Sequence, residues 1–382
     1  MKRLLLWIIP LLLLCSFACA QEAEEITQEC KIRACEDEIQ LDRLMDKNYK
    51  TAWYTYTTGE HWLEVTAPEG KTIGSVYFQW KRNKDFVDYP YYPFQVEVYS
   101  QGEWVVYHVE KDNTFMANYL ELPNVTAFRV RDVDGRFNRL RLCELSVFGV
   151  GDKPDWVQVW EPAPERAELM VVAAHPDDEM LYMGGTIPYY AGERDKETVV
   201  VMLTCGGFYR HLELLDALWL CGVRTYPVMV DMPDKVTSTT TQMYKYWSRN
   251  ELYGAIVKAY RQFKPLVVVT HDVNGEYGHG AHKAAADAVR AAAVLAADPS
   301  EYEDSYKAYG VWDVPKIYLH LYHQGKIRMD WNQPLTFFDG KTALEMAEAG
   351  FQCHVSQRDK KYLEVLDSGP YDNAEFGLYR SY

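Results

Sequence analysis

Residues 174–179, AHPDDE, place one imidazole and three carboxylates directly behind the apolar run ELMVVA. An apolar run of this kind predicts a buried β-strand, so the acidic residues fall where that strand ends. Aspartates that cap the following helix in a solvated loop are one explanation. The other is a bound cation, which would offset the negative charge of Asp177 and Asp178.

A second polar stretch, HDVNGEYGHGAH at residues 271–282, follows the apolar run LVVVT. His279 and His282 are three positions apart at the start of an expected helix, which puts both imidazoles on one face. Because ligands gather at the carboxyl ends of parallel strands, the two loops should present their side chains to one spot. Two imidazoles and one carboxylate, with one position left for water, are typical of catalytic zinc. The two loops together therefore predict a metal site.

The region from residue 168 onward alternates apolar strands with helical patterns. Its strands, such as TVVVMLT and LVVVTH, are continuous apolar runs. Runs of this kind are typical of a parallel sheet that is covered on both faces by helices. No G-x-G-x-x-G motif follows the first strand, which argues against dinucleotide binding. We expect residues 168–382 to form a doubly wound α/β, Rossmann-like domain with a mostly parallel sheet.

Residues 21–150 follow a different pattern, in which short alternating strands such as FQVEVYS and EWVVYHVE are separated by turn residues. This spacing predicts an antiparallel β-sandwich. Residues 151–167 are rich in proline and charge and predict a linker. The chain is therefore expected to be a multi-domain protein, and its 382 residues are enough for about two domains.

The first 20 residues begin with Lys2 and Arg3, continue with an apolar stretch and end on small residues, which predicts a secretory signal. The mature chain is then expected to be exported to the periplasm or the exterior, without a transmembrane helix. Lipidation of Cys19 would instead make it an outer-surface lipoprotein. The net charge of −15 argues against a nucleic-acid partner, because phosphate binding requires a basic surface. Export permits a disulfide between Cys143 and either Cys30 or Cys35.

The segments MDKNYKTAWYT at residues 45–55 and LRLCELSVFGVG at residues 140–151 resemble the ends of the discoidin, or galactose-binding-like, family of jelly-roll modules. The residues that match the opening motif are Asp46, Asn48, Thr51 and Trp53. The resemblance implies a jelly-roll sandwich that binds a glycan through its loops and holds a structural Ca²⁺ near the opening motif. The aromatic run DYPYYP at residues 88–93 is a candidate glycan contact.

The segments AAHPDDEMLYMGGTI at residues 173–187 and HDVNGEYGHGAH together resemble the PIG-L (LmbE-like) family of zinc-dependent N-acetylglucosaminyl deacetylases. The stretches RHLELLDALWLCGV and HVSQ support the likeness, which extends over residues 168–382. Matched position by position, the resemblance implies one Zn²⁺ held by His175, Asp178 and His282.

The same resemblance implies a role for three further residues. Asp177 would be the general base for metal-activated water, and Tyr277 would help to stabilise the oxyanion. His279, as a cation, would aid the tetrahedral intermediate or protonate the leaving amine. Many members have an acidic residue between the two histidines, where this chain has Ala281. We therefore expect a lower pKa for His279 and a rate optimum at lower pH.

Three further residues are candidates for the surroundings of the metal and the substrate. Arg210 could contact a substrate hydroxyl or phosphate, or form a surface pair with Glu213. Asp231 could hold sugar hydroxyls at the end of the strand YPVMVD. Glu179 could support a metal ligand, or be an acid favoured by the helix dipole.

The sequence thus predicts an exported zinc N-deacetylase, a hydrolase of linear amide C–N bonds that removes acetyl from an N-acetylglucosamine-type glycan. The β-sandwich would bind a glycan of its own or position the substrate. Two alternatives stay open: a carbohydrate-binding protein with an inactive hydrolase domain, and a metallo-amidase that acts on a non-sugar substrate.

Overall fold

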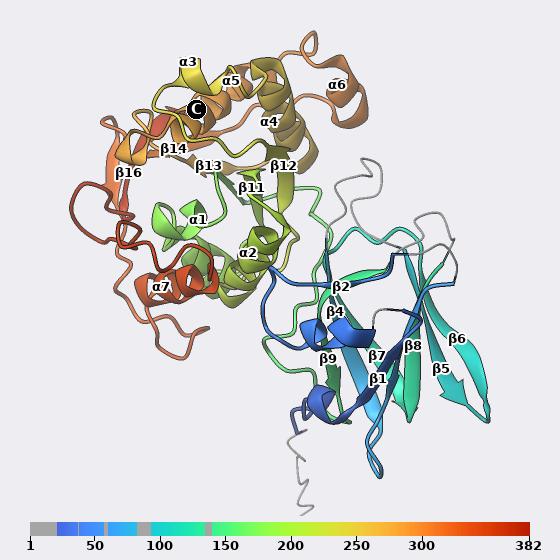
Figure 1. Cartoon of the computed structure of the whole chain (residues 1–382). Helices are drawn as coiled ribbons and strands as arrows, with labels where there is room; N and C mark the ends of the chain where they lie inside the picture. Colours follow the sequence, from blue (N-terminus) through green and yellow to red (C-terminus); the bar gives the residue numbers. More distant parts are fainter. Residues whose placement is uncertain (1–20, 37, 57–59, 82–92, 134–139) are drawn as a thin grey trace, which may run out of the picture.

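The computed structural model of the chain describes residues 21–36, 38–56, 60–81, 93–133 and 140–382 (Figure 1). The predicted signal at residues 1–20 and most of the aromatic run at residues 88–93 lie outside these ranges. Among the described residues, no helix has the length and apolar character that crossing a membrane requires.

Two antiparallel sheets make up the N-terminal half (Figure 1). In spatial order, the first contains β1 (Lys31–Ala34), β3 (Trp62–Thr66), β8 (Ala127–Asp132), β5 (Phe94–Ser100) and β6 (Glu103–Glu110). The second contains β2 (Trp53–Tyr54), β9 (Arg141–Phe148), β4 (Ile73–Trp80) and β7 (Ala117–Val125). The short helices of this half are η1 (Thr27–Glu29) and η2 (Glu38–Leu44).

The two sheets share one apolar core, as the alternating strand pattern predicts. In β3, Leu63 and Val65 are buried while the residues between them are partly exposed. Both side chains belong to the same cluster as Phe78 and Trp80 of the other sheet. This period of two is typical of strands that cover a core with one face. Trp53 and Trp80 are fully buried in this core.

A seven-stranded sheet organises the C-terminal half. Its spatial order is β12 (Val228–Met232), β11 (Thr198–Thr204), β10 (Leu169–Ala173), β13 (Val267–Thr270), β14 (Lys316–His320), β16 (Glu375–Ser381) and β15 (Lys326–Arg328). The first five are parallel, and β16 runs antiparallel to both of its neighbours. The expected mostly parallel sheet is present.

Helices cover both faces of this sheet. They are α1 (Asp178–Leu181), α2 (Phe208–Leu220), α3 (Thr240–Met243), α4 (Arg249–Phe263), α5 (Gly280–Leu295), α6 (Glu303–Tyr309) and α7 (Ala343–Cys353), with the short η3 (Pro188–Glu193) and η4 (Glu276–Gly278). Val171 of β10 packs in the cluster of α2 and α7, whereas its neighbour Val172 packs in that of α4 and α5. Because successive strand side chains point to opposite faces, a continuous apolar strand serves both layers.

The two halves pack against each other through the four-stranded sheet and α2. Tyr77 and Phe148 lie in one apolar cluster with Leu214. Polar contacts cross the same boundary, because the Tyr49 hydroxyl donates to Asp216 over 2.8 Å. Val157, in the predicted linker, is buried in this cluster. The linker region is thus part of the interface, and the exact domain limits stay a prediction.

The disulfide that export would permit is not formed by the described cysteines. In the described part of the chain Cys30, Cys35 and Cys143 are free thiols, as are the three cysteines of the C-terminal half. Cys143 is buried in the cluster shared by the two halves, whereas Cys30 packs against the sandwich core. The two therefore face opposite sides of the four-stranded sheet, which the spacing of cysteines along the chain could not indicate.

Candidate metal centre

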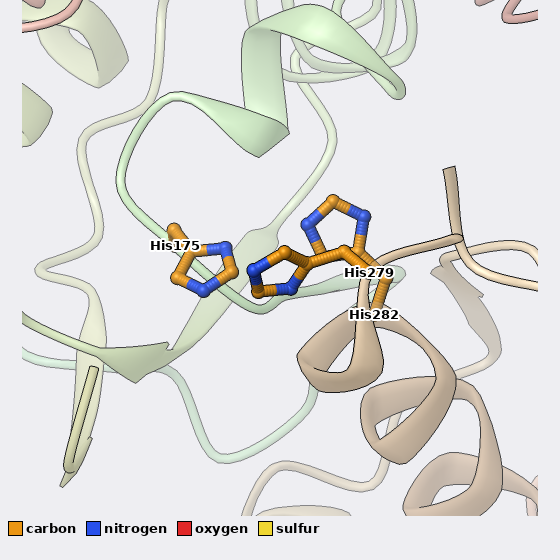
Figure 2. A group of neighbouring side chains, drawn as sticks. All are labelled: His175, His279 and His282. Carbon is orange, nitrogen blue, oxygen red and sulfur yellow. The ribbon is translucent and has the colours of Figure 1, made fainter. Parts of the chain in front are cut away.

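Three imidazoles from two loops meet at the carboxyl ends of β10 and β13, which are adjacent parallel strands. His175 follows β10, and His279 and His282 lie at the start of α5 (Figure 2). The ring centroid of His175 lies 4.8 Å from that of His279 and 5.3 Å from that of His282. One ligand nitrogen from each ring lies within 4.8 Å of the other two. The predicted convergence of the two loops is confirmed.

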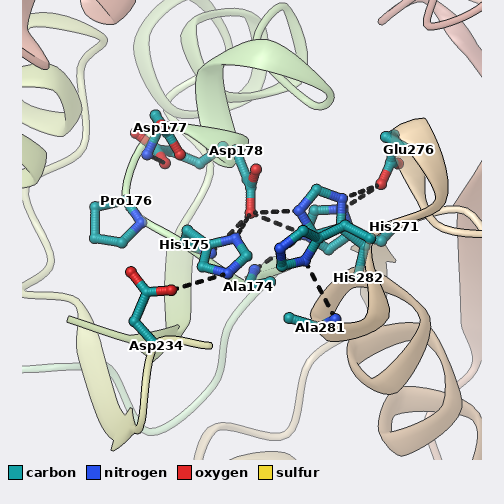
Figure 3. A network of polar contacts seen from close by, with 12 residues as sticks. Ala174, His175, Pro176, Asp177, Asp178, Asp234, His271, Glu276, Ala281 and His282 are labelled. Atoms are coloured by element: carbon teal, nitrogen blue, oxygen red, sulfur yellow. Dashed lines mark hydrogen bonds and ion pairs between the residues drawn. The ribbon is translucent and has the colours of Figure 1, made fainter. Parts of the chain in front are cut away.

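Asp178 lies between the histidines predicted as its fellow ligands (Figure 3). Its Oδ2 is 2.9 Å from Nδ1 of His175 and 3.3 Å from Nε2 of His282. The same oxygen accepts the backbone N–H of His175, at 2.7 Å, which ties the loop to the first turn of α1. All three side chains are buried. The structure thus gathers the three residues that the resemblance implied.

Glu276 orients His282 from behind. This fully buried carboxylate lies 2.7 Å from Nδ1 of His282 and 2.8 Å from Nδ1 of His271, both through Oε2. Its Oε1 lies 2.6 Å from Nδ1 of His320. Since Nδ1 of His282 donates to Glu276, Nε2 of His282 faces Asp178. A carboxylate behind a ligating histidine is a recurrent feature of metal sites.

Nε2 of His282 is buried and has no hydrogen-bond partner among the described residues. Burial alone would lower the pKa of His282, but Asp178 and Glu276 outweigh it and raise the pKa to about 10. Two carboxylates that hold a proton on this ring would also stabilise a cation beside Nε2. Imidazole nitrogens and a carboxylate oxygen are the donors that zinc prefers, so the residues present fit a zinc ion.

His271 approaches the same carboxylate but is a poor ligand. Its Nε2 lies 3.6 Å from Oδ2 of Asp178. That nitrogen already accepts the backbone N–H of Ala174 at 3.0 Å, while Nδ1 donates to Glu276. Burial lowers the pKa of His271, in line with a neutral ring that has no free lone pair. His271 therefore holds the backbone at Ala174 in place and does not offer a nitrogen to a metal.

His279 has a different tautomer from its neighbours. Its Nδ1 accepts the backbone N–H of Ala281 at 3.3 Å and so caps α5. In a neutral ring the proton is then on Nε2, which makes this atom a donor and not a ligand. Burial, with the nearby His175 and His282, lowers the pKa of His279 to about 3. The lowered pKa agrees with the expectation from Ala281 and favours a neutral ring, while the cationic role of His279 stays a prediction.

Tyr277 is held beside this cluster by an unusual backbone conformation. Its φ and ψ of 42° and 24° are left-handed, which is costly for a residue with a side chain. The ring lies with its centroid 5.2 Å from that of His282 and 5.6 Å from that of His279. It is half exposed, and burial with the charge of Asp178 raises its pKa. Tyr277 therefore keeps its hydroxyl proton and can donate it in a hydrogen bond.

Asp177 is also in a strained conformation, with φ 128° and ψ −31° at the beginning of α1. Burial raises its pKa to about 7, with a further contribution from Asp178, and Arg210 opposes this shift. Nη2 of Arg210 is 3.3 Å from Oδ2 of Asp177. A strained backbone conformation persists only where the surrounding structure holds it in place, and such conformations cluster at functional sites. A carboxyl group with a pKa near neutrality is suited to proton transfer.

Arg210 points into the site from α2. It is 7% exposed and contacts Asp177, the carbonyl of Pro176 and Asp234, whose Oδ2 is 3.3 Å from Nη1. A surface pair with Glu213 is therefore excluded, since Glu213 accepts hydrogen bonds from Ser356 instead. The structure places Arg210 at the predicted location but leaves its role as a prediction.

Glu179 supports the backbone of the site. Its Oε2 accepts the N–H of Asp177 at 2.8 Å, and its Oε1 lies 2.6 Å from Nε2 of His354. Both side chains are fully buried. Of the two explanations open for Glu179, the structure favours the supporting one, because a solvated acid at a helix end would be exposed.

Asp231 is exposed at β12 with a left-handed backbone, and its predicted role with sugar hydroxyls stays a prediction. The acid that reaches the cluster is Asp234, whose Oδ1 is 3.8 Å from Nε2 of His175. Three residues near the cluster were not among the predicted site residues: Asp234, Glu276 and Tyr182, whose ring meets that of His282 edge-on with centroids 5.6 Å apart. Glu276 and Tyr182 belong to the two motifs, but position in a motif does not specify the direction of a side chain, and Asp234 lies outside both motifs.

Comparisons with known proteins agree with this geometry. The PIG-L family model, GlcNAc-PI de-N-acetylase, matches residues 170–293. A 1D-myo-inositol 2-acetamido-2-deoxy-alpha-D-glucopyranoside deacetylase of Catenulispora acidiphila is 32% identical over 179 residues, covering 39% of this chain and 54% of the relative. An enzyme of the same description from Mycobacterium leprae is 30% identical over 218 residues, covering 44% of this chain and 68% of the relative. The chain thus spans about half the length of the first of these relatives.

Among solved structures, the family 32 CBM of Clostridium perfringens NanJ in complex with galactose is 14% identical, with a TM-score of 0.27. It covers 33% of this chain and 98% of that chain. The identity of the N-terminal half as a discoidin-like module stays a prediction.

Proposed function

Because the chain belongs to the PIG-L family, we propose that it is a zinc-dependent hydrolase that removes the acetyl group from an N-acetylated amino sugar. The observation that carries the proposal is the buried cluster of His175, Asp178 and His282, in which Nε2 of His282 has no hydrogen-bond partner among the described residues. Relatives whose names describe deacetylation of a 2-acetamido-2-deoxy-glucopyranoside support the substrate class.

In this proposal His175, Asp178 and His282 hold one zinc ion. A zinc ion bound there would polarise the acetamide carbonyl and make water more acidic near neutral pH. Glu276 keeps Nε2 of His282 directed at the ion through the contact at Nδ1. The strongly lowered pKa of Glu276, caused by His271 and the hydrogen bonds from three imidazoles against the effect of burial, keeps it anionic for this purpose.

Asp177 takes the proton from the attacking water. Its pKa of about 7 lets it accept a proton and return it within one reaction cycle near neutral pH. Because His279 is neutral at rest, Asp177 is also the group that returns this proton to the leaving nitrogen. The carbon–nitrogen bond breaks, and acetate and a free amine are the products.

His279 and Tyr277 donate hydrogen bonds to the oxygen that becomes negative as water adds to the carbonyl. The fixed tautomer of His279 places a proton on Nε2, and the raised pKa of Tyr277 keeps its hydroxyl protonated. Donors that are already oriented are worth more in a buried site than in water. Of the two roles open for His279, this tautomer favours oxyanion stabilisation over protonation of the amine.

Arg210 and Asp234 form the polar wall on the other side of His175. We assign them to the sugar hydroxyls, because a guanidinium and a carboxylate can bind a pair of neighbouring hydroxyls. The β-sandwich would hold a second portion of the glycan, and its opening motif would bind Ca²⁺. Export of the mature chain, with or without lipidation of Cys19, belongs to the same proposal.

Acetate release tests this function. The purified chain would be given N-acetylglucosamine oligosaccharides, an inositol-linked N-acetylglucosaminide and acylated amines without a sugar, before and after removal of zinc by a chelator. We expect zinc-dependent acetate release from the sugars alone. Release from the non-sugar amides would point to a general metallo-amidase, and glycan binding without any release would point to a carbohydrate-binding protein.

A further inference from the structure

A second cluster of metal-binding side chains lies in the β-sandwich, far from the catalytic loops in sequence. It consists of Cys35, Glu36 and His61, each of which offers one ligand atom within 4.8 Å of the other two. Cys35 and Glu36 directly follow β1, and His61 directly precedes β3. Nothing in the proposed deacetylation uses these residues.

The antiparallel pairing of β1 with β3 creates this cluster. Ala34 lies opposite Leu63, and the N–H of Cys35 donates to the carbonyl of Trp62 at 3.1 Å. Continuing the register of Ala34 and Leu63 by two residues puts Glu36 opposite His61. Residues 25 positions apart along the chain therefore become cross-strand neighbours at the edge of the sheet, where β1 is the outermost strand.

His61 supplies the independent observation. It is 3% exposed, and neither Nδ1 nor Nε2 has a hydrogen-bond partner among the described residues. Glu36 lies beside it, with Oε1 at 3.5 Å from Nδ1. Leaving a buried polar group without a partner has a free-energy cost, because its hydrogen bonds to water are lost and not replaced. A side chain that is buried at this cost, beside a thiol and a carboxylate, indicates a missing ligand.

We propose that Cys35, Glu36 and His61 bind a zinc ion that fastens the edge strand β1 to β3. A thiolate, an imidazole and a carboxylate suit zinc or a similar borderline ion, whereas calcium and magnesium take oxygen ligands. Tetrahedral bonds of about 2.0 to 2.3 Å separate ligand atoms by about 3.4 to 3.8 Å, so small side-chain rotations complete the site. The Cys35 thiol releases its proton to solvent on binding, and water occupies the fourth position.

Cobalt substitution tests the proposal with a signal that the catalytic centre does not produce. Metal would be stripped from the full chain and replaced by Co²⁺, and the near-ultraviolet charge-transfer band from thiolate to cobalt would be recorded. The catalytic ligands are nitrogen and oxygen only, so the band reports a cysteine ligand. We expect the band to be saturated once both sites hold one cobalt each, to vanish in Cys35→Ser and to persist in Cys30→Ser, the half-buried cysteine five residues earlier.

Zinc content gives the second measurement. In a background carrying Asp178→Asn and His282→Ala, we expect one zinc per chain, which is lost on adding Cys35→Ser or the partly exposed Glu36→Gln. Cys35→Ser alone should keep deacetylase activity, and zinc should raise the unfolding temperature of the background protein. Absence of a thiolate band in the wild-type chain, or a band that survives Cys35→Ser, overturns the proposal whether or not the chain is a deacetylase.

Discussion

Oε2 of Glu276 accepts the Nδ1 proton of His282 over 2.7 Å, and this contact decides which nitrogen of His282 faces Asp178. The same carboxylate also contacts His271 and His320. A single buried acid therefore sets the orientation of one candidate ligand and of the two rings behind it.

Glu276→Gln should weaken zinc binding by about 10- to 100-fold, because an amide neither fixes the His282 tautomer nor balances its charge. Zinc dissociation measured by competition with a chelator checks this. Glu213→Gln is the matched control, since Glu213 is an equally buried carboxylate that contacts Ser356 instead. An unchanged affinity in Glu276→Gln would remove Glu276 from the metal centre.

Substitutions of Asp177 and Asp178 should have different effects on activity and metal content. Asp177→Asn should lower kcat by about 10² to 10⁴, because it removes the base, while the zinc of the catalytic centre is retained. Asp178→Asn should lose that one zinc, because an amide is a weaker ligand than a carboxylate. Metal analysis beside acetate-release kinetics distinguishes the two. If Asp177→Asn also lost its metal, the division between base and ligand would be wrong.

Ala281→Asp should raise the pKa of His279, since it adds a carboxylate to the residue whose N–H the ring accepts. Because the neutral ring is the proposed donor, the acidic limb of the activity profile is then expected at higher pH than in the wild type. Ala281 is fully buried, so Ala281→Asn serves as a control for the bulk and polarity of the new side chain. The same acidic limb in wild type, Asn and Asp variants would contradict this link.

Asp216 should make the stability of the interface depend on pH. Burial raises its pKa to about 7, although hydrogen bonds from Tyr49 and Gln158 oppose this. Between about pH 4 and 7 the folded state then binds more protons than the unfolded state, so stability falls as pH rises through this window. In Asp216→Asn the free energy of unfolding should change less between these pH values, by a few kcal/mol, than it does in the wild type.

Urea unfolding at several pH values measures this effect. Asp155→Asn is the control, because Asp155 is an exposed carboxylate near the same interface. A slope of stability against pH that is equal in wild type and Asp216→Asn would show that Asp216 titrates normally.

Calcium should stabilise the β-sandwich. Burial, with Asp46, raises the pKa of Glu144 to about 8, while the backbone of Asn48 donates to it at 2.9 Å. A calcium ion bound between the carboxylates of Glu144 and Asp46 would offset their repulsion, because calcium takes oxygen ligands. We expect Ca²⁺ to raise the unfolding temperature of the wild type but not of Glu144→Gln. An equal rise in both would place any calcium elsewhere.

Sequence patterns were most informative where one segment carried its own signal. Continuous apolar runs predicted the parallel strands, and alternation predicted the antiparallel sheets, because both patterns report which faces of a strand are covered. The position of His175 and Asp178 after one strand, and of His282 after another, was enough to predict that they meet. The cysteines carried no such signal, and the thiols that export would allow to pair are free in the described part of the chain.

The amino-acid sequence by itself determined the two types of sheet and the pair of loops that converge on the candidate metal. Only the tertiary structure decided that Glu276 accepts the Nδ1 proton of His282 and that the N–H of Ala174 donates to Nε2 of His271. It also decided that Asp234, rather than Asp231, lies near His175. The physical reason is that a hydrogen bond depends on distance and direction in space. Residue type and spacing along the chain restrict which partners can meet, but they do not choose among them.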